Sequence, residues 1–234
     1  VVVVGRSEES LAACQRTFDA TAPGRFACLS GDATSSAASE TAVAECVARF
    51  GRFDGLYHVA GGSGRRHGDG CLDEVTDEGV RYTLAQNLES VIYSNRAAVR
   101  SLLDRGVGGS VLNMGSVLGS SPSPRYFGTA VYAATKAAIE GLTRTNAARY
   151  ATENIRFNAV TPALVDTPMA GRAVGDDEIQ RFIQTKQPLD GGRVGRPDDL
   201  DALSVLLLSE AGRFITGQVI AVDGGWSVSE GQYA

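Results

Sequence analysis

The chain has 234 residues, 43% hydrophobic and 21% charged, with a formal net charge of −5 and a pI near 5.1. This composition is typical of a globular domain with a substantial core, and an acidic chain without a basic run argues against nucleic acid as a partner. No apolar stretch approaches the roughly 18 residues of a membrane span, so no membrane partner is expected. The four cysteines and two histidines show no metal-ligand spacing. No metal site is therefore expected, and the cysteines indicate free thiols in a cytoplasmic location.

Strand-like and helix-like segments alternate along the chain. In order, the first half predicts a strand at Val1 to Gly5, a helix capped by Ser7 and running to Thr21, a strand at Arg25 to Ser30, a helix at Ala37 to Phe50, a strand at Gly55 to Ala60 and a long helix at Asp77 to Arg105. The second half predicts a strand at Ser110 to Met114, a helix at Tyr132 to Ala151, a strand at Ile155 to Thr161, helices at Asp176 to Lys186 and Pro197 to Ser209, and a strand at Gln218 to Val222. Uninterrupted apolar strands between helices predict a doubly wound α/β fold with a parallel sheet, in one domain over residues 1–234.

One predicted helix begins with a candidate acid–base pair. Tyr132-Ala-Ala-Thr-Lys136 places a lysine four residues after a tyrosine, so both side chains share a helix face. A nearby cation lowers the pKa of a phenol, which is otherwise about 10. The pair is therefore predicted to act in proton transfer, although such a pair on its own is more often exposed and without a role.

Ser116 is a second candidate, because it stands where the strand at Ser110 to Met114 ends, sixteen residues before Tyr132. Ligands of open α/β sheets bind outside the carboxyl ends of the strands, so this hydroxyl is expected to face the binding crevice. The alternative is a loop serine that bonds to its own backbone.

These residues together resemble the short-chain dehydrogenase/reductase family, and the similarity continues over nearly the whole chain. Asn87 looks like the family's helix asparagine, which completes a Ser-Tyr-Lys-Asn tetrad. Four further segments follow in the family's order: Asp32-Ala33, His58-Val59-Ala60-Gly61-Gly62, Pro162-Ala163-Leu164-Val165-Asp166-Thr167, and Thr216 to Gly225. His58 and Ala163 depart from the family pattern, which has an asparagine and a glycine at these places.

The resemblance implies an oxidoreductase with a Rossmann-like fold that transfers a hydride between a nicotinamide cofactor and a carbonyl or alcohol substrate. Tyr132 would exchange a proton with the substrate oxygen, and Ser116 would hydrogen-bond that oxygen. Lys136 would lower the pKa of the tyrosine and hold the nicotinamide ribose, and Asn87 would hold a water that links Lys136 to solvent. The implied cofactor contacts are Arg6, Asp32, Ala33, Ala60, Gly61, Tyr132, Lys136, Pro162, Val165 and Thr167.

Arg6 favours NADP over NAD. It follows the first predicted strand, at the place where NAD-preferring relatives usually carry an acidic residue. A guanidinium pairs well with a 2′-phosphate, whereas the alternative is a solvated arginine at a strand end.

The resemblance also implies a homotetramer, or a homodimer, formed through the helices 77–105 and 132–151. Small and apolar residues on these helices suit close packing between subunits: Ala97, Ala98, Ile139 and Ala147. The substrate itself is not identified. Its pocket is expected under residues 164–194 together with Tyr126 and Phe127, a region that includes Met169, Arg172, Phe182 and Ile183.

Two other functions stay open on the same fold: a cofactor-sensing regulator without catalysis, and a dehydratase or epimerase acting on a sugar nucleotide. Such regulators typically lose the tyrosine or the lysine, and both are present here. Enzymes acting on sugar nucleotides tend to carry a C-terminal substrate domain that is longer than the segment after Pro162 in this chain. Both comparisons favour the reaction of an alcohol or ketone.

The family's opening strand and its Thr-Gly-x-x-x-Gly-x-Gly turn have no counterpart in this sequence. The spacing of Arg6, Asp32 and Ala60 identifies the strand at Val1 to Gly5 as the family's second, with about thirty residues missing ahead of it. That strand and the one containing Leu56 should then flank a gap of about 9–10 Å, the width of one missing strand. The alternative is that Val1 to Gly5 is the first strand and pairs directly with Leu56 to Val59, with Gly5-Arg6-Ser7 as a degenerate phosphate turn.

Overall fold

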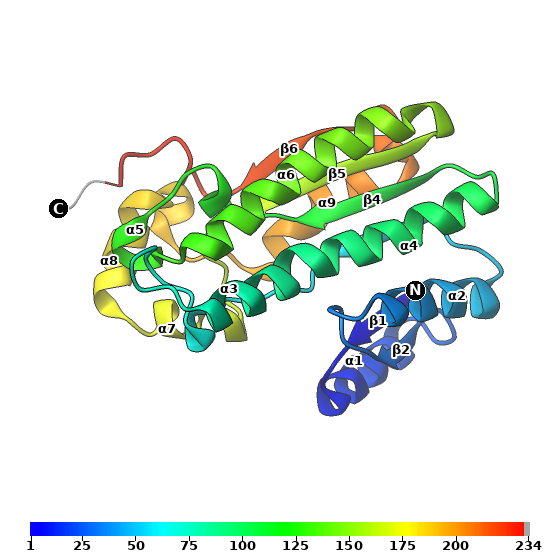
Figure 1. Cartoon of the computed structure of the whole chain (residues 1–234), viewed down its shortest axis with the longest axis horizontal. Helices are drawn as coiled ribbons and strands as arrows, with labels where there is room; N and C mark the ends of the chain where they lie inside the picture. Colours follow the sequence, from blue (N-terminus) through cyan, green and yellow to red (C-terminus); the bar gives the residue numbers. More distant parts are fainter. Residues whose placement is uncertain (232–234) are drawn as a thin grey trace.

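The computed structural model describes residues 1–231, which form two parallel sheets with helices packed around them (Figure 1). The first sheet pairs β1 (Val2–Gly5) with β2 (Ala27–Ser30). The second has the order β3-β4-β5-β6, from β3 (Gly55–His58), β4 (Gly109–Met114), β5 (Ile155–Pro162) and β6 (Val219–Val222). Every pairing is parallel, which confirms the predicted doubly wound α/β class.

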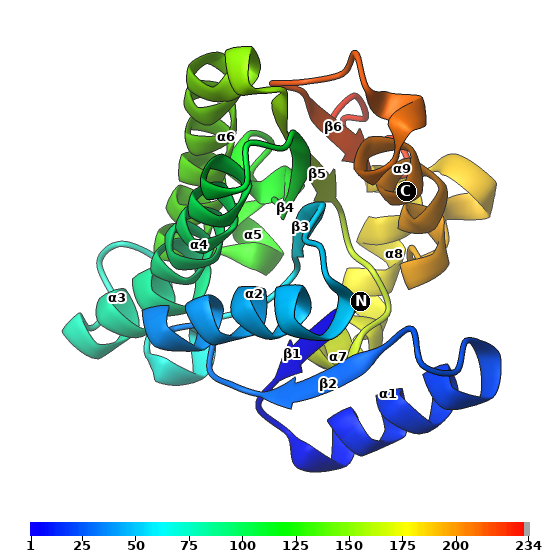
Figure 2. The same cartoon turned by 90° about the vertical axis from the view of Figure 1, so that its right-hand side faces the viewer.

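The helices cover both faces of the second sheet (Figure 2). On one face lie α3 (Asp77–Leu84), a π-helical turn (Ala85–Glu89), α4 (Ser90–Asp104) and α6 (Ala130–Tyr150), and on the other lies α9 (Asp201–Leu208). The first sheet carries α1 (Glu8–Thr21) and α2 (Ser36–Phe50). A lobe of α5 (Pro124–Phe127), α7 (Gly171–Val174) and α8 (Asp177–Lys186) lies beyond the carboxyl ends of β4 and β5 (Figure 1).

The two sheets share no strand pairing, so β1 and β3 are not neighbours in one sheet. The alternative in which Val1 to Gly5 pairs directly with Leu56 to Val59 is therefore wrong. The lack of pairing between β1 and β3 agrees with the predicted gap between these two strands. Whether one further strand belongs between β1 and β3, and whether residues 1–234 act as one domain, stay predictions.

Local signals explain why most helices begin where the sequence predicts. The Ser7 hydroxyl accepts the Ser10 N–H at 3.2 Å, and the Asp176 carboxylate accepts the N–H groups of Glu178 and Ile179 at 2.9 and 3.0 Å. The long helix predicted from Asp77 is interrupted, since the π-helical turn inserts one extra residue at Ala85–Glu89. The short helices α5 and α7 were not predicted, because four-residue segments show no helical period.

The core fills both sides of the second sheet, because successive strand residues point to opposite faces. On β4, Val111 packs with Phe157 and Leu102 beneath α4 and α6, whereas its neighbour Leu112 packs with Leu207 beneath α9. A third cluster, built around the buried Trp226, fills the lobe of α5, α7 and α8. In residues 1–231, no helix combines the length and apolar character needed to cross a membrane.

Candidate active site

Tyr132 and Ser116 meet where β4 ends. Ser116 follows the last residues of β4 and is 8% exposed, and its hydroxyl accepts the Leu118 N–H at 3.2 Å. Tyr132 lies in the first turn of α6, which crosses this end of the sheet, and its phenol hydrogen-bonds to Ser116. The structure therefore brings together two of the predicted catalytic residues from elements sixteen residues apart in sequence.

Lys136 lies one helical turn after Tyr132 and is only 4% exposed. Its Nζ is 5.5 Å from the centroid of the Tyr132 ring and donates to the carbonyl of Met114 at 2.9 Å. Lys136 therefore reaches past the phenol toward the end of β4, and the four-residue spacing places both groups on the same side of the helix, as predicted.

Burial dominates the electrostatics of this pair. Desolvation lowers the pKa of Lys136 to about 8. Desolvation also raises the pKa of the Tyr132 phenol, and its hydrogen bond to Ser116 opposes this by a smaller amount. The expectation that Lys136 gives the tyrosine a lowered pKa is therefore corrected for this structure. Removing a charged phenolate from water costs more than the neighbouring groups return.

Asn87 lies in the π-helical turn and is fully buried. Its Oδ1 accepts the Gly62 N–H at 3.0 Å, and its Nδ2 donates to the carbonyls of Gly62 and Thr83 at 2.8 and 3.0 Å. Both amide hydrogens are thereby used, so the side chain clamps the loop after β3 to the helix. Its implied role in holding a water beside Lys136 stays a prediction.

Gly61 lies between Asn87 and Lys136. A Cβ atom at Gly61 would stand 2.8 Å from Asn87 Oδ1 and 3.8 Å from Lys136 Nζ. Only a residue without a side chain leaves this space open between the two groups. All four predicted tetrad residues therefore lie around the ends of β3 and β4.

His58, which replaces the family's asparagine, is buried at the end of β3. Its Nε2 lies 3.0 Å from the Ala60 carbonyl and its Nδ1 lies 2.7 Å from the Ser94 hydroxyl. A neutral ring that donates through Nε2 and accepts through Nδ1 satisfies both contacts. Desolvation and the charge of Lys136 lower the pKa of His58 to about 4, which favours this neutral form.

The predicted cofactor contacts lie at the carboxyl ends of four strands. Arg6 follows β1, and Asp32 and Ala33 follow β2, which pairs with β1 in register. The Asp32 carboxylate accepts the N–H and hydroxyl of Thr34 at 2.9 and 2.8 Å, and these bonds, with a smaller contribution from Arg6, lower its pKa. Ala60 and Gly61 follow β3, whereas Pro162, Val165 and Thr167 end or follow β5.

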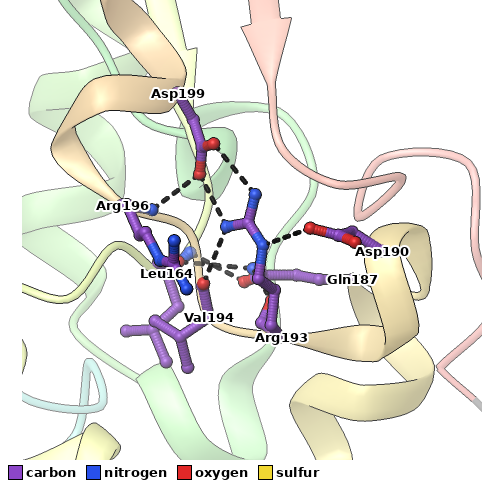
Figure 3. A network of polar contacts seen from close by, with 7 residues as sticks. All are labelled: Leu164, Gln187, Asp190, Arg193, Val194, Arg196 and Asp199. Carbon is purple, nitrogen blue, oxygen red and sulfur yellow. Dashed lines mark hydrogen bonds and ion pairs between the residues drawn. The ribbon is translucent and has the colours of Figure 1, made fainter.

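A network that the sequence did not predict holds the segment after β5 (Figure 3). Gln187 lies at the end of α8 and is buried. Its Oε1 accepts the Leu164 N–H at 2.9 Å. Its Nε2 donates to the Leu164 and Arg193 carbonyls, both at 3.3 Å. The Arg193 guanidinium pairs with both oxygens of Asp199 at 2.7 and 2.9 Å and with Asp190 at 2.6 Å (Figure 3). These bonds hold the pKa of the Asp199 carboxyl well below its ordinary value and fix the backbone next to Val165.

The expected substrate pocket stays a prediction, and its residues lie at two depths. Phe182 and Ile183 are buried with Trp226 inside the lobe, so they support it rather than line an open surface. Met169 is 57% exposed, and Arg172 is exposed with its guanidinium donating to the Tyr126 carbonyl at 2.9 Å. Of these four residues, only Met169 and Arg172 reach solvent.

The charge around Arg172 comes from two loops of this end of the molecule. Burial lowers the pKa of Arg172, the charge of Arg65 in the loop after β3 lowers it further, and the Asp176 carboxylate raises it by a smaller amount. Within residues 1–231, no group of three or more histidine, cysteine, aspartate or glutamate side chains could hold a metal ion.

Comparisons with known proteins agree with this geometry. A family model described as enoyl-(acyl carrier protein) reductase matches residues 1–227. The 2-keto-3-deoxy-L-fuconate dehydrogenase of Xanthomonas campestris is 36% identical over 80% of this chain and 61% of its own length. The 2-dehydro-3-deoxy-D-gluconate 5-dehydrogenase of Dickeya dadantii is 31% identical over 86% of this chain and 76% of its own length. The chain spans about three fifths of the length of the first of these relatives.

Solved structures give the same result. A short-chain type dehydrogenase/reductase from Mycobacterium ulcerans superposes with a TM-score of 0.89 at 30% identity, over 98% of this chain and 81% of the other. A gluconate 5-dehydrogenase from Burkholderia cenocepacia, in complex with NADP and tartrate, superposes with a TM-score of 0.85 at 28% identity, over 96% and 84%. The chain belongs to the short-chain dehydrogenase/reductase family.

Proposed function

We propose that the protein is an NAD(P)-dependent oxidoreductase that interconverts an alcohol and a carbonyl compound. The observation that carries this proposal is the meeting of Tyr132, Ser116 and Lys136 at the end of β4, with Asn87 and Gly61 beside them. The implied cofactor residues fit a dinucleotide, because they line the carboxyl ends of the strands and Gly61 leaves room near Lys136. The bound nicotinamide supplies or accepts the hydride.

The chain's own residues handle the proton. In the reducing direction, the Tyr132 phenol donates its proton to the carbonyl oxygen, and in the oxidising direction the phenolate accepts it back from the alcohol. The Ser116 hydroxyl donates a hydrogen bond to the same oxygen, where negative charge develops. The Lys136 ammonium favours the phenolate and offsets part of the cost of its burial.

NADP is the proposed cofactor, with NAD as the alternative. Arg6 is exposed at the end of β1, next to the loop that holds Asp32. A guanidinium at this place pairs with a 2′-phosphate, as bidentate arginines do. Fluorescence titration of both reduced coenzymes tests this: Arg6→Gln should weaken NADPH binding by at least ~10-fold and leave NADH binding nearly unchanged. Tighter NADH binding in the wild type would contradict the proposal.

A carboxylate-bearing hydroxy acid or keto acid is the proposed substrate class. The two sugar-acid dehydrogenases named above act on such compounds, and the gluconate 5-dehydrogenase was solved with tartrate. The charge of Arg65 lowers the pKa of Arg172 and the Asp176 carboxylate raises it, so a substrate carboxylate near Arg172 would offset the repulsion from Arg65. A screen of hydroxy acids against matched neutral alcohols tests this. Arg172→Gln should raise KM for the acids by at least ~10-fold, and Arg66→Gln serves as the matched control.

A homotetramer, or a homodimer, is the proposed assembly, but the residues predicted to form it are corrected. Ala97, Ala98, Ile139 and Ala147 are buried inside the subunit, and Ala98 and Ala147 belong to the core beneath α4 and α6. On α6 the exposed alanine and glycine residues are instead Ala134, Ala137, Gly141 and Ala148, which share one helix face. Light scattering at micromolar concentration tests the assembly, and a monomer mass would contradict it.

Tyr132→Phe tests the function as a whole. This change removes the proton and keeps the ring, so turnover should fall by at least ~10² while coenzyme binding stays nearly intact. A regulator would bind coenzyme in both forms and turn over no substrate. A dehydratase or epimerase would convert sugar nucleotides without net change in the coenzyme. A variant that keeps a near-normal rate would refute the assigned role of Tyr132.

A further inference from the structure

Helix α6, which carries Tyr132, begins without a capping side chain of its own. Its N-cap residue, Thr129, makes no side-chain hydrogen bond to the first turn. The first N–H groups of a helix have no intrahelical acceptor, so a buried start needs acceptors from elsewhere. The N–H groups of Val131 and Tyr132 donate to the two carboxylate oxygens of Asp69, at 3.2 and 2.9 Å. An acidic residue some sixty positions upstream therefore caps this helix.

The same loop satisfies the remaining N–H of the first turn. The Ala130 N–H donates to the Gly70 carbonyl at 2.9 Å, and intrahelical bonding starts with Ala133, whose N–H reaches the Thr129 carbonyl at 3.1 Å. All free N–H groups at the start of α6 thus have acceptors. The backbone of Tyr132 is held by a carboxylate, which forms stronger hydrogen bonds than a neutral acceptor.

Asp69 is itself buried, with 2% of its surface exposed. It accepts a third hydrogen bond, from the Thr83 hydroxyl at 3.3 Å, and Thr83 in turn accepts from Asn87 through its carbonyl at 3.0 Å. The carboxylate accepts all three of these hydrogen bonds and donates none. One polar network therefore joins the backbone of Tyr132 to Asn87 and, through it, to the loop after β3.

The loop that presents Asp69 has little freedom to move. The Asp69 N–H donates to the Gly64 carbonyl at 3.1 Å, and the Thr76 N–H donates to the Gly68 carbonyl at 3.0 Å. Gly68 has a φ of 94°, which only glycine adopts readily. A Cβ at Gly64 would overlap the Thr83 hydroxyl. These backbone hydrogen bonds and close contacts fix the loop, and therefore the position from which Asp69 reaches α6.

We propose that Asp69 is a positioning residue for the acid–base tyrosine, because its buried carboxylate fixes the first turn of α6 and hence the place of the phenol against Ser116. The inference rests on the proposed role of Tyr132.

Amide hydrogen exchange followed by NMR on the full chain tests the proposal. Asp69→Asn removes the charge and one of the two acceptors. Amide exchange at Val131 and Tyr132 should then accelerate by at least ~10-fold. With a hydroxy acid that the screen identifies as substrate, kcat should fall by at least ~10-fold while the coenzyme Kd stays within about twofold.

Asp223→Asn is the matched control, because Asp223 also accepts two backbone N–H groups through its two oxygens, from Gly225 and Ser227, both at 2.9 Å. This variant should change neither kcat nor the amide exchange at the start of α6. Equal effects in the two variants, or no effect of Asp69→Asn, would overturn the proposal.

Thr83→Val provides a second variant if Asp69→Asn does not fold, since it removes only the third hydrogen bond to the carboxylate. Exchange at the Tyr132 amide should then accelerate, with exchange at Ala147, later in α6, unchanged. No acceleration at Tyr132 would overturn the proposal. If Tyr132→Phe keeps its rate, the proposed function fails instead, and the exchange measurements still report whether Asp69 holds the helix.

Discussion

Lys136 should cost the folded protein stability at neutral pH. Burial lowers its pKa from an ordinary value of 10.5 to about 8. At about 1.4 kcal/mol for each pKa unit, this corresponds to about 3 kcal/mol. The hydrogen bond from Nζ to the Met114 carbonyl returns about 1 kcal/mol when the lysine is present. Lys136→Met should therefore raise the free energy of unfolding at about pH 7 by about 2 kcal/mol.

The sign of the pH dependence follows from which state holds the proton. Between pH 8 and 10.5 the unfolded chain keeps the Lys136 proton that the folded protein has released. The unfolded state then binds more protons, so the free energy of unfolding rises with pH over this range. Below pH 8 both states are protonated, and the folded state carries the whole desolvation cost. The difference between wild type and Lys136→Met should therefore shrink as pH rises above 8.

Urea unfolding at a series of pH values measures this directly, and Lys186→Met is the matched control. Lys186 is the only other lysine; it bonds to the Ser229 carbonyl and stands over the Trp226 ring, 5.7 Å from its centroid. In Lys186→Met, the free energy of unfolding should still rise between pH 8 and 10.5, as it does in wild type. A Lys136→Met variant that is less stable than wild type at neutral pH, with the same slope above pH 8, would refute the reasoning.

Three further outcomes are expected. Lys136→Met should also weaken coenzyme binding and lower turnover. Calorimetric titration should show a higher coenzyme Kd and rate assays a lower kcat, in the same variant that urea unfolding shows to be more stable. Burial lowers the pKa of His58 from 6.5 to about 4, so on acidification the unfolded chain gains the His58 proton first. His58→Asn should therefore remove about 3 kcal/mol of the stability that wild type loses between these pH values in urea titrations, and an unchanged loss would contradict this. Gly64→Ala should lower the free energy of unfolding by about 1–3 kcal/mol, because its Cβ would overlap the Thr83 hydroxyl. Adding Thr83→Ala should recover part of this loss. An unchanged urea midpoint in Gly64→Ala would contradict the close packing of this loop.

The sequence by itself determined most of the elements and the relative placement of the candidate residues, because both depend on neighbours along the chain. Apolar runs and caps such as Ser7 lie within a few residues of the helix or strand that they define. The helical period alone places Lys136 beside Tyr132, and the end of an apolar strand places Ser116 at the crevice. These signals are local, so one sequence is enough to locate them.

Tertiary structure alone decided what surrounds these residues. Asp69 caps α6 from a loop some sixty residues away, and Gln187 clamps the segment after β5 from the end of α8. No periodicity in the sequence encodes either contact. The pKa values were also beyond the sequence, since the cost of burying Tyr132 outweighs the favourable neighbours that its motif predicts. Desolvation depends on every atom that excludes water from a group, and most of those atoms belong to residues distant in the chain.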